Sequence, residues 1–200
     1  SLNYTSGTTG NPKGVVYHHR GGYLMATGSV TAWNMPNRLN FLYTVPMFHC
    51  NGWCYPWTLA MLHARVICIR NIRAKEIFEL ISEHKITHFG GAPIILNMLA
   101  NAPKEEQIKL NHKVYVLTAA APPPSIIFKK MKELGFEVMH VYGLTETYGH
   151  ILQCAWNSAW DELNEDEKAD ISSRQGVRYP NTEDVKVMNP ENMKTVPNDG

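Results

Sequence analysis

The sequence has few cysteines, no excess of either charge and no long apolar run. Its four cysteines are too scattered for a disulfide framework, and the nearest two, Cys50 and Cys54, lack the C-x2-C spacing of zinc and redox motifs. We therefore expect buried free thiols. Lys and Arg number 19 against 18 Asp and Glu, a formal net charge of +1, which creates no field for nucleic acid or a membrane surface. We expect no nucleic-acid partner and no transmembrane segment.

The sequence also lacks an initiating methionine and a signal peptide. Its most distinctive stretch, YTSGTTGNPKG, begins at residue 4, directly after the first strand-like residues. From these features we expect residues 1–200 to be a fragment of a longer protein, with parts of its domain missing on both sides.

Strand-like and helix-like segments alternate over most of the chain, and this order predicts an α/β fold with a mostly parallel sheet and helices on both faces. Farther along, the acidic composition of 160–171 predicts an exposed helix, and 183–188 is expected to begin another sheet. The predicted strands cover 39–45, 65–70, 86–92, 113–119 and 136–143, and the predicted helices cover 18–33, 53–62, 74–85, 93–102 and 124–135.

The stretch 4–14 combines glycines, hydroxyl side chains and a single lysine, Lys13. Glycine lets the backbone turn and present its N–H groups, hydroxyls add donors, and a lysine adds counter-charge, so the combination suits a polyphosphate. The stretch is not a Walker A motif, which requires glycine directly before the lysine, because Asn11 and Pro12 separate Gly10 from Lys13. The GxGxxG fingerprint of dinucleotide-binding folds is absent as well. The alternative is a flexible surface loop that binds nothing.

The same stretch resembles the signature of adenylate-forming enzymes, which include acyl-CoA synthetases, 4-coumarate-CoA ligases, luciferases and peptide-synthetase adenylation domains. Three further segments are similar to motifs of that family, in its order: PMFHCNGW (46–53), TAAAPPP (118–124) and VYGLTET (141–147). Segments such as HCNGWC, THFGGAP and TETYGHILQCAW look most like the plant acyl-activating branch. The resemblance implies part of the family's large N-terminal domain, without the region that precedes it and without the small C-terminal domain that carries a further lysine.

For the full-length protein, the resemblance implies an ATP-dependent acyl-CoA ligase that uses Mg²⁺ and coenzyme A. A carboxylate would attack the α-phosphate of ATP to give an acyl-adenylate and diphosphate, and the thiol of coenzyme A would then release AMP. A short, medium-chain or benzoate-like acid is expected, and a peroxisomal or cytoplasmic location. Three alternatives stay open: transfer to a carrier-protein thiol, luciferase-like oxidation, and a nucleotide-binding relative without activity. The isolated fragment is expected to be inactive.

By the same resemblance, particular residues take roles in phosphate binding, adenosine binding, catalysis and the acyl pocket. The phosphate-binding residues are Thr5, Ser6, Gly7, Thr8, Thr9, Gly10 and Lys13. Those around the adenosine and α-phosphate are Ala120, Ala121, Pro122, Tyr142, Gly143 and Thr145. The catalytic set is His49, Lys13, Thr145 and Glu146, with Glu146 as the Mg²⁺ ligand. The acyl pocket is His49, Trp53, Gly90, Gly91, Ala92, His140 and Val141.

Each of these residues also has an ordinary structural interpretation. Tyr142 suits a hydrophobic core, Glu146 a solvated turn, and His49 a satisfied core histidine. The family has glycine in places where this chain has Ala119–Ala121 and Val141, so a narrower adenine site and acyl pocket are expected.

Overall fold

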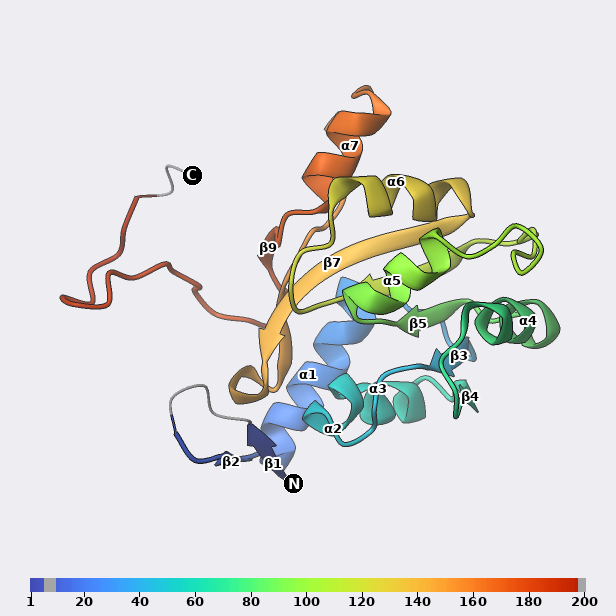
Figure 1. The fold of residues 1–200 in the computed structure, drawn as a ribbon. Coiled ribbons are helices and arrows are strands. Elements are labelled where there is room, and N and C mark those ends of the chain that lie inside the picture. The colour runs from blue at the N-terminus through green and yellow to red at the C-terminus, as the bar shows by residue number, and fades with distance from the viewer. Residues whose placement is uncertain (6–9, 198–200) are drawn as a thin grey trace.

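A seven-stranded sheet lies at the centre of the computed structural model, which describes residues 1–5 and 10–197 (Figure 1). Its strand order is β4-β3-β5-β6-β7-β8-β9, with the first five strands parallel and the last two antiparallel. The strands are β3 (Asn40–Tyr43), β4 (Arg65–Cys68), β5 (His88–Gly90), β6 (Val114–Thr118), β7 (Phe136–Leu144), β8 (Gly149–Gln153) and β9 (Val177–Arg178).

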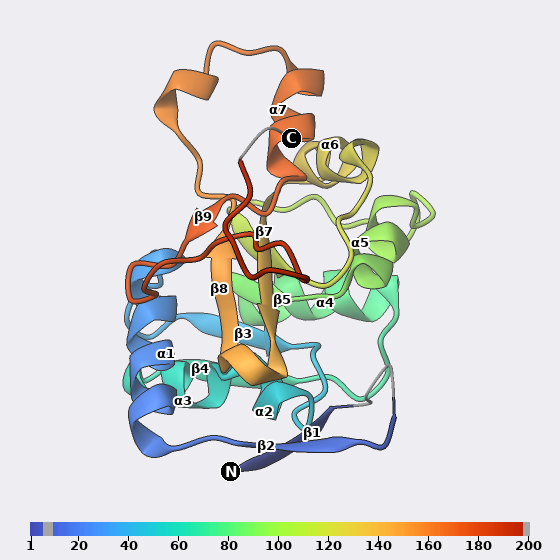
Figure 2. The ribbon, with the colours of Figure 1, turned by 90° about the vertical axis from the view of Figure 1, so that its left-hand side faces the viewer.

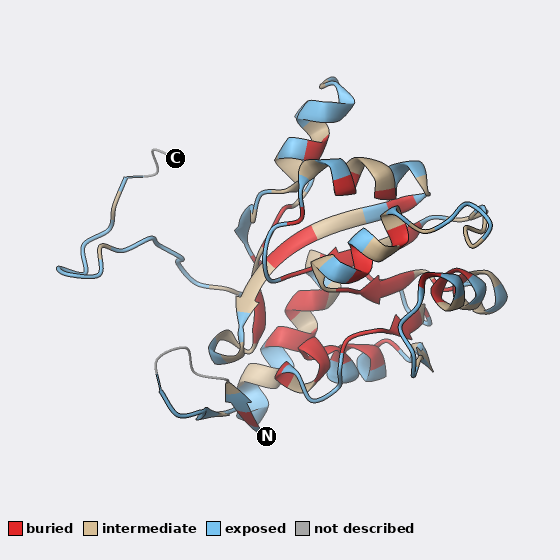
Figure 3. Ribbon diagram, in the orientation of Figure 1, coloured by how far each residue is buried: buried red, intermediate tan, exposed pale blue. Residues whose placement is uncertain are grey.

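Helices cover both faces of this sheet. Successive strand residues point to opposite sides, so each face presents its own set of apolar side chains for helices to pack against. On β3, Phe41 and Tyr43 join one core cluster, with residues of α1 and α3, whereas Leu42 joins a second cluster with α4, α5 and α6. Figure 3 shows buried residues both on the strands and on the helices packed around them. The helices are α1 (His19–Ala32), α2 (Cys50–Trp53), α3 (Tyr55–Met61), α4 (Ala74–His84), α5 (Pro93–Ala100), α6 (Ser125–Glu133) and α7 (Glu165–Ser172). The α/β fold with a mostly parallel sheet is therefore confirmed.

Sequence signals for individual elements are readily recognised. On α4, the apolar residues Ile77, Phe78 and Ile81 recur at helical spacing and are fully buried. Pro93 begins α5 and Pro56 lies in the first turn of α3, where a missing N–H costs nothing. Gly135 follows α6 with φ +91°, a conformation that favours glycine.

A separate hairpin precedes the sheet. Strands β1 (Leu2–Thr5) and β2 (Lys13–Val16) pair antiparallel, with Thr5 opposite Lys13. The sequence predicted strand-like residues before the loop, but β2 was expected to be part of that loop. Its identification as a strand rests on its pairing with β1.

Two expectations for the C-terminal part need correction. Residues 183–188 form no strand, and Met188 makes only an isolated bridge with Thr195. Conversely, β8 and β9 extend the sheet beyond β7, where no strand was expected. The acidic helix forms as α7, but it begins at Glu165, where Asn164 accepts from the backbone N–H groups of Asp166 and Glu167.

Across residues 1–5 and 10–197, no helix is both long enough and apolar enough to cross a membrane.

Candidate active site

The order in which the chain adds strands reverses between the neighbouring strands β3 and β5: from β3 the chain continues to β4 on one side, and from β5 to β6 on the other. The chain leaves β3 through α2 and α3 on one face and leaves β5 through α5 on the other, as their membership of different core clusters shows. In open α/β sheets, ligands bind at such a point, outside the carboxyl ends of the strands. The segments that follow these two strands, 46–53 and 91–92, contain His49, Trp53 and Ala92, all expected in the acyl pocket.

Trp53 covers the carboxyl end of β5. A Cβ added at Gly90 would lie 3.0 Å from the Trp53 ring, and Trp53 is only 8% exposed. The Thr44 hydroxyl donates to the Gly90 carbonyl, and the Gly91 N–H donates to the Leu117 carbonyl at 2.8 Å. The structure therefore brings three of the expected pocket residues together, Trp53, Gly90 and Gly91, and leaves little room for a side chain at Gly90.

An unusual backbone turn follows His49. His49 is exposed, and the residues Cys50–Cys54 all have positive φ, a conformation that costs non-glycine residues of order 1 kcal/mol or more each. Side chains from elsewhere hold this turn. The Tyr43 hydroxyl donates to the Gly52 carbonyl at 2.6 Å, and the Cys54 thiol donates to the Tyr148 carbonyl at 2.6 Å.

The turn after β7 lies against this segment (Figure 2). It contains a short 3-10 helix, η1 (Thr145–Thr147). The Cys50 thiol and the Thr145 hydroxyl are 3.0 Å apart, and the buried Tyr17 hydroxyl donates to the Thr145 carbonyl at 2.6 Å. Tyr17 also stacks on Tyr148, with ring centroids 4.3 Å apart. Segments far apart in sequence therefore converge on Thr145.

The expected phosphate loop is only partly described. Thr5 and Lys13 are partners across the β1–β2 hairpin, so the two ends of the loop meet, and β1 contacts η1. Lys13 and Gly10 are exposed. Four of the expected phosphate-binding residues lie outside the described residues: Ser6, Gly7, Thr8 and Thr9.

The expected adenine segment follows β6, beside β7, at the same edge of the sheet. Ala120, Ala121 and Pro122 are exposed there. Ala120 has φ +80°, a conformation that alanine rarely adopts. This backbone conformation favours glycine, the residue type that the family resemblance implies for this segment. Tyr142 and Gly143 are half-buried on β7.

The structure does not bring two of the expected pocket residues together. His140 and Val141 are adjacent on β7, so they point to opposite faces, and Val141 is buried with the α1 and α3 cluster. His140 instead contacts the backbone carbonyls of Ser173 and Arg174, at 2.7 and 3.1 Å.

A second tryptophan, Trp57, follows Trp53 closely in the sequence but does not join it at Gly90. Trp57 lies on α3 against Gly22 of α1, whereas Trp53 lies on Gly90. The left-handed turn that ends at Cys54 separates the two side chains.

Several side chains around Thr145 were given no role from the sequence. Tyr17 and Cys50 are both buried and contact Thr145. The Tyr148 hydroxyl accepts a hydrogen bond from the His18 N–H at 2.9 Å. Their proximity to the TET segment and to His49 was the available clue. Burial raises the pKa of Tyr17, and the nearby Cys50 and Cys54 thiols raise it further. The hydroxyl therefore stays protonated and can donate a hydrogen bond.

Two buried histidines pack near these elements. His88 on β5 lies against Trp33 and Tyr115, and its pKa is lowered to about 4 by burial. His150 on β8 lies edge-on to Trp53, with a pKa lowered to about 3 by burial. Both imidazoles are therefore neutral in the folded protein near pH 7.

These histidines predict an acid-sensitive fold. The unfolded chain binds protons on both below about pH 6.5, whereas the folded state stays neutral, so stability is expected to fall as pH drops from 6.5 toward 4. Each contributes up to about 1.4 kcal/mol per pH unit. Urea unfolding at several pH values measures the slope. His88→Phe, which suits the aromatic neighbours of His88, should flatten it, and an equal slope in the variant would contradict the assignment.

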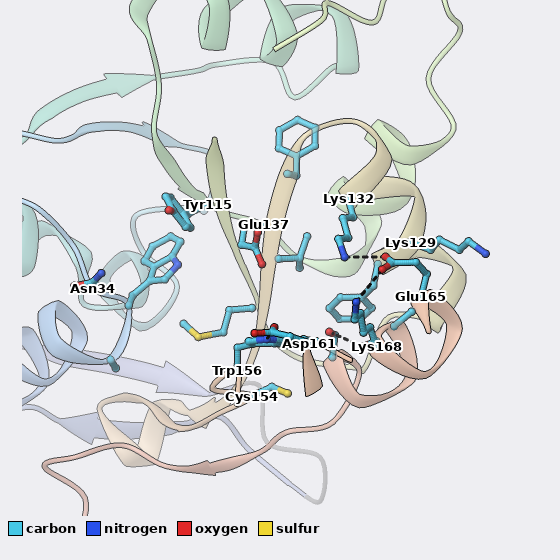
Figure 4. A pocket seen from close by; sticks show the side chains of 18 residues that line it. Asn34, Tyr115, Lys129, Lys132, Glu137, Cys154, Trp156, Asp161, Glu165 and Lys168 are labelled. Atoms are coloured by element: carbon cyan, nitrogen blue, oxygen red, sulfur yellow. Dashed lines mark hydrogen bonds and ion pairs between the residues drawn. The ribbon is translucent and has the colours of Figure 1, made fainter. Parts of the chain in front are cut away.

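A cavity of about 430 Å³ lies elsewhere, between α6, α7 and β7 (Figure 4). Trp156 and Tyr115 contribute to its walls, and none of the expected site residues lines it. At its mouth, Glu165 pairs with Lys132 at 2.7 Å and with Lys168 at 3.1 Å. Both lysines therefore already share a carboxylate partner, and the cavity is separate from the candidate site.

The donor set suits a magnesium ion bound mainly by phosphate. Glu146 is exposed, and within residues 1–5 and 10–197 it makes no ion pair. The same residues contain no group of three or more His, Cys, Asp or Glu placed to hold a metal. Mg²⁺ commonly takes one or two protein carboxylates and completes its octahedron with phosphate oxygens and water, so Glu146 alone is compatible with this ion.

The parallel sheet, with these motifs gathered at its carboxyl edge, defines the class as the large domain of the adenylate-forming enzymes. The family model described as "AMP-binding enzyme" matches residues 1–200, and the chain belongs to this family.

The chain is 51% identical to the acetate/butyrate–CoA ligase AAE7, peroxisomal, of Arabidopsis thaliana, and 50% identical to the acetate–CoA ligase CCL3 of Humulus lupulus. All of the chain is matched in both cases, but it spans only 35% of each relative's length. The N-terminal domain of FACL13 from Mycobacterium tuberculosis superposes with a TM-score of 0.72 at 30% identity, covering 76% of this chain and 38% of that one.

Proposed function

We propose that residues 1–200 are the central part of an AMP-forming acyl-CoA ligase that activates a short-chain carboxylic acid. The observation that carries the proposal is the meeting of four segments with expected site residues at one edge of the sheet: those after β3, β5, β6 and β7. Regions before and after these residues would complete the enzyme, including the C-terminal domain with its lysine.

In this proposal, the described residues surround the triphosphate. Lys13, opposite Thr5 in the hairpin, supplies positive charge to the β- and γ-phosphates together with the hydroxyls of the loop. Thr145 donates to the α-phosphate, and Glu146 holds Mg²⁺, which when bound neutralises phosphate charge. His49 lies beside the reacting carboxylate, at the carboxyl end of β3. Positioning and charge neutralisation account for the catalysis.

Trp53 supports a short acyl substrate. Its ring lies on Gly90, where it would limit the space for a longer acyl chain, and it packs in a T-shaped arrangement with His150. A short acid fits this arrangement, in line with the acetate and butyrate named for the relatives.

Trp53→Gly is therefore expected to shift the preference of the full-length protein from two- to four-carbon acids toward longer ones. A methylene in such a pocket is worth about 1–3 kcal/mol, so kcat/KM for hexanoate should rise about tenfold or more relative to acetate. A panel of carboxylates followed by AMP formation measures this. Trp57→Gly is the matched control, since Trp57 lies against α1. An unchanged chain-length profile in Trp53→Gly would contradict the pocket assignment.

The same assay tests the function itself. Release of AMP that depends on coenzyme A supports the ligase, release that requires a carrier-protein thiol supports that alternative, and nucleotide binding without AMP release indicates a relative that has lost activity. We further propose a peroxisomal location, which a peroxisomal tripeptide at the C-terminus of the full reading frame would support. Purified residues 1–200 are expected to produce no AMP.

A further inference from the structure

We propose that Cys50 is a positioning residue that orients the Thr145 hydroxyl toward the nucleotide. This inference rests on the proposed function, in which Thr145 donates to the α-phosphate. Cys50 was not among the residues expected in the site, and its thiol has no role in the chemistry described so far.

The contact is partly buried, with the thiol on its buried side. The Cys50 sulfur lies 3.0 Å from the Thr145 Oγ1, and Cys50 is 8% exposed. Among the described residues, the Thr145 side chain has no other hydrogen-bond partner. A hydroxyl has one proton to donate and two lone pairs to accept with. If the thiol donates to one lone pair, the hydroxyl proton is left free for a phosphate oxygen.

The backbone of Thr145 is held independently. The Tyr17 hydroxyl donates to the Thr145 carbonyl at 2.6 Å, and Tyr17 stacks on Tyr148. Backbone and side chain of Thr145 are thus fixed by different segments, Tyr17 from the residues before α1 and Cys50 from the turn after β3. Fixing both leaves the hydroxyl little freedom to turn away from a ligand.

The strain at Cys50 supports a functional role. Cys50 has φ +45° and begins the left-handed turn that ends at Cys54 and also carries Trp53 over Gly90. Strained conformations persist where surrounding contacts impose them, and they are concentrated at functional sites. The Cys50–Thr145 contact therefore joins the wall of the acyl pocket to the residue at the α-phosphate.

A double-mutant cycle on the full-length protein tests the coupling. Cys50→Ala removes the contribution of about one neutral hydrogen bond, so we expect AMP affinity and the ATP–diphosphate exchange rate to fall about fivefold. In a Thr145→Val background the same change should have less than about a twofold effect, because the hydroxyl is already gone. Cys50→Ser, which keeps a donor, should retain more affinity than Cys50→Ala.

Binding measurements separate positioning from a general structural effect. Calorimetry should show weaker binding of AMP, which carries the α-phosphate, but unchanged binding of diphosphate. Cys154→Ala is the matched control: that buried thiol donates to the Ile171 carbonyl at 3.2 Å, away from Thr145, and its loss should leave AMP affinity unchanged.

Additive effects in the cycle, or equal weakening of AMP and diphosphate, would overturn the role of Cys50. Failure of the wild-type protein to form acyl-CoA would overturn the proposed function instead. The two failures are distinguishable, because AMP binding is measured without turnover.

Discussion

Glu146→Gln is expected to lower the rate of adenylate formation about a hundredfold in the full-length protein. Glutamine preserves the size of the side chain but removes the charge that would hold Mg²⁺ beside the phosphates. Losses of 10²–10³ are typical when a group that stabilises transition-state charge is removed. Glu146 is exposed, and in the described part of the chain no ion pair restrains it, so the fold should be unaffected.

ATP–diphosphate exchange, measured over a range of magnesium concentrations, checks this result. A metal ligand predicts that the magnesium requirement of Glu146→Gln rises and that excess magnesium restores part of the rate. Glu105→Gln removes an equally exposed carboxylate in the turn after α5 and should leave exchange unchanged. Wild-type magnesium dependence in Glu146→Gln would rule out this carboxylate as the ligand.

Gly143→Ala is expected to destabilise the protein by about 3 kcal/mol. A Cβ at Gly143 would lie 1.9 Å from the Gly149 carbonyl oxygen and 2.7 Å from the Cα of His150. These atoms belong to the backbone of β8, which no side-chain rotation can move, so the β7–β8 pair must separate. Overpacking costs of 1–3 kcal/mol or more are usual in such cases. Because Tyr142 and Thr145 flank this position, adenylation should be lost as well.

Gly22→Ala provides a control of opposite sign. Gly22 lies within α1, and its nearest neighbour is the Trp57 ring at 4.0 Å, so a methyl group fits there. Alanine in a helix interior is favoured over glycine by about 0.5–1 kcal/mol, so this variant should be slightly more stable. Urea unfolding of both variants measures the difference. If Gly143→Ala unfolds at the wild-type urea concentration, the close β7–β8 approach is incorrect.

Local patterns in the sequence were sufficient for the parallel part of the sheet. Helix α4 shows its apolar stripe, α5 its initial proline and α6 its terminal glycine, and each of these signals depends only on neighbouring residues. The antiparallel additions were not predictable in this way. Strand β8 is recognised as a strand by its pairing with β7 across η1.

The motifs likewise determined which residue types to consider, but not their contacts. Sequence order indicated that Thr145 and Glu146 follow a strand, and the family resemblance suggested what they do. The family resemblance placed His140 and Val141 in one pocket, yet alternation along β7 places them on opposite faces of the sheet.

By itself, the sequence determined the family, the α/β class and most of the strands and helices, because these depend on short motifs and local periodicity. Only the tertiary structure decided that Tyr17 and Cys50 meet at Thr145 and that Trp53 lies on Gly90. Such contacts join segments separated by tens to more than a hundred residues. They depend on strand order and on the left-handed turn at Cys50–Cys54, neither of which is encoded in any one stretch of neighbouring residues.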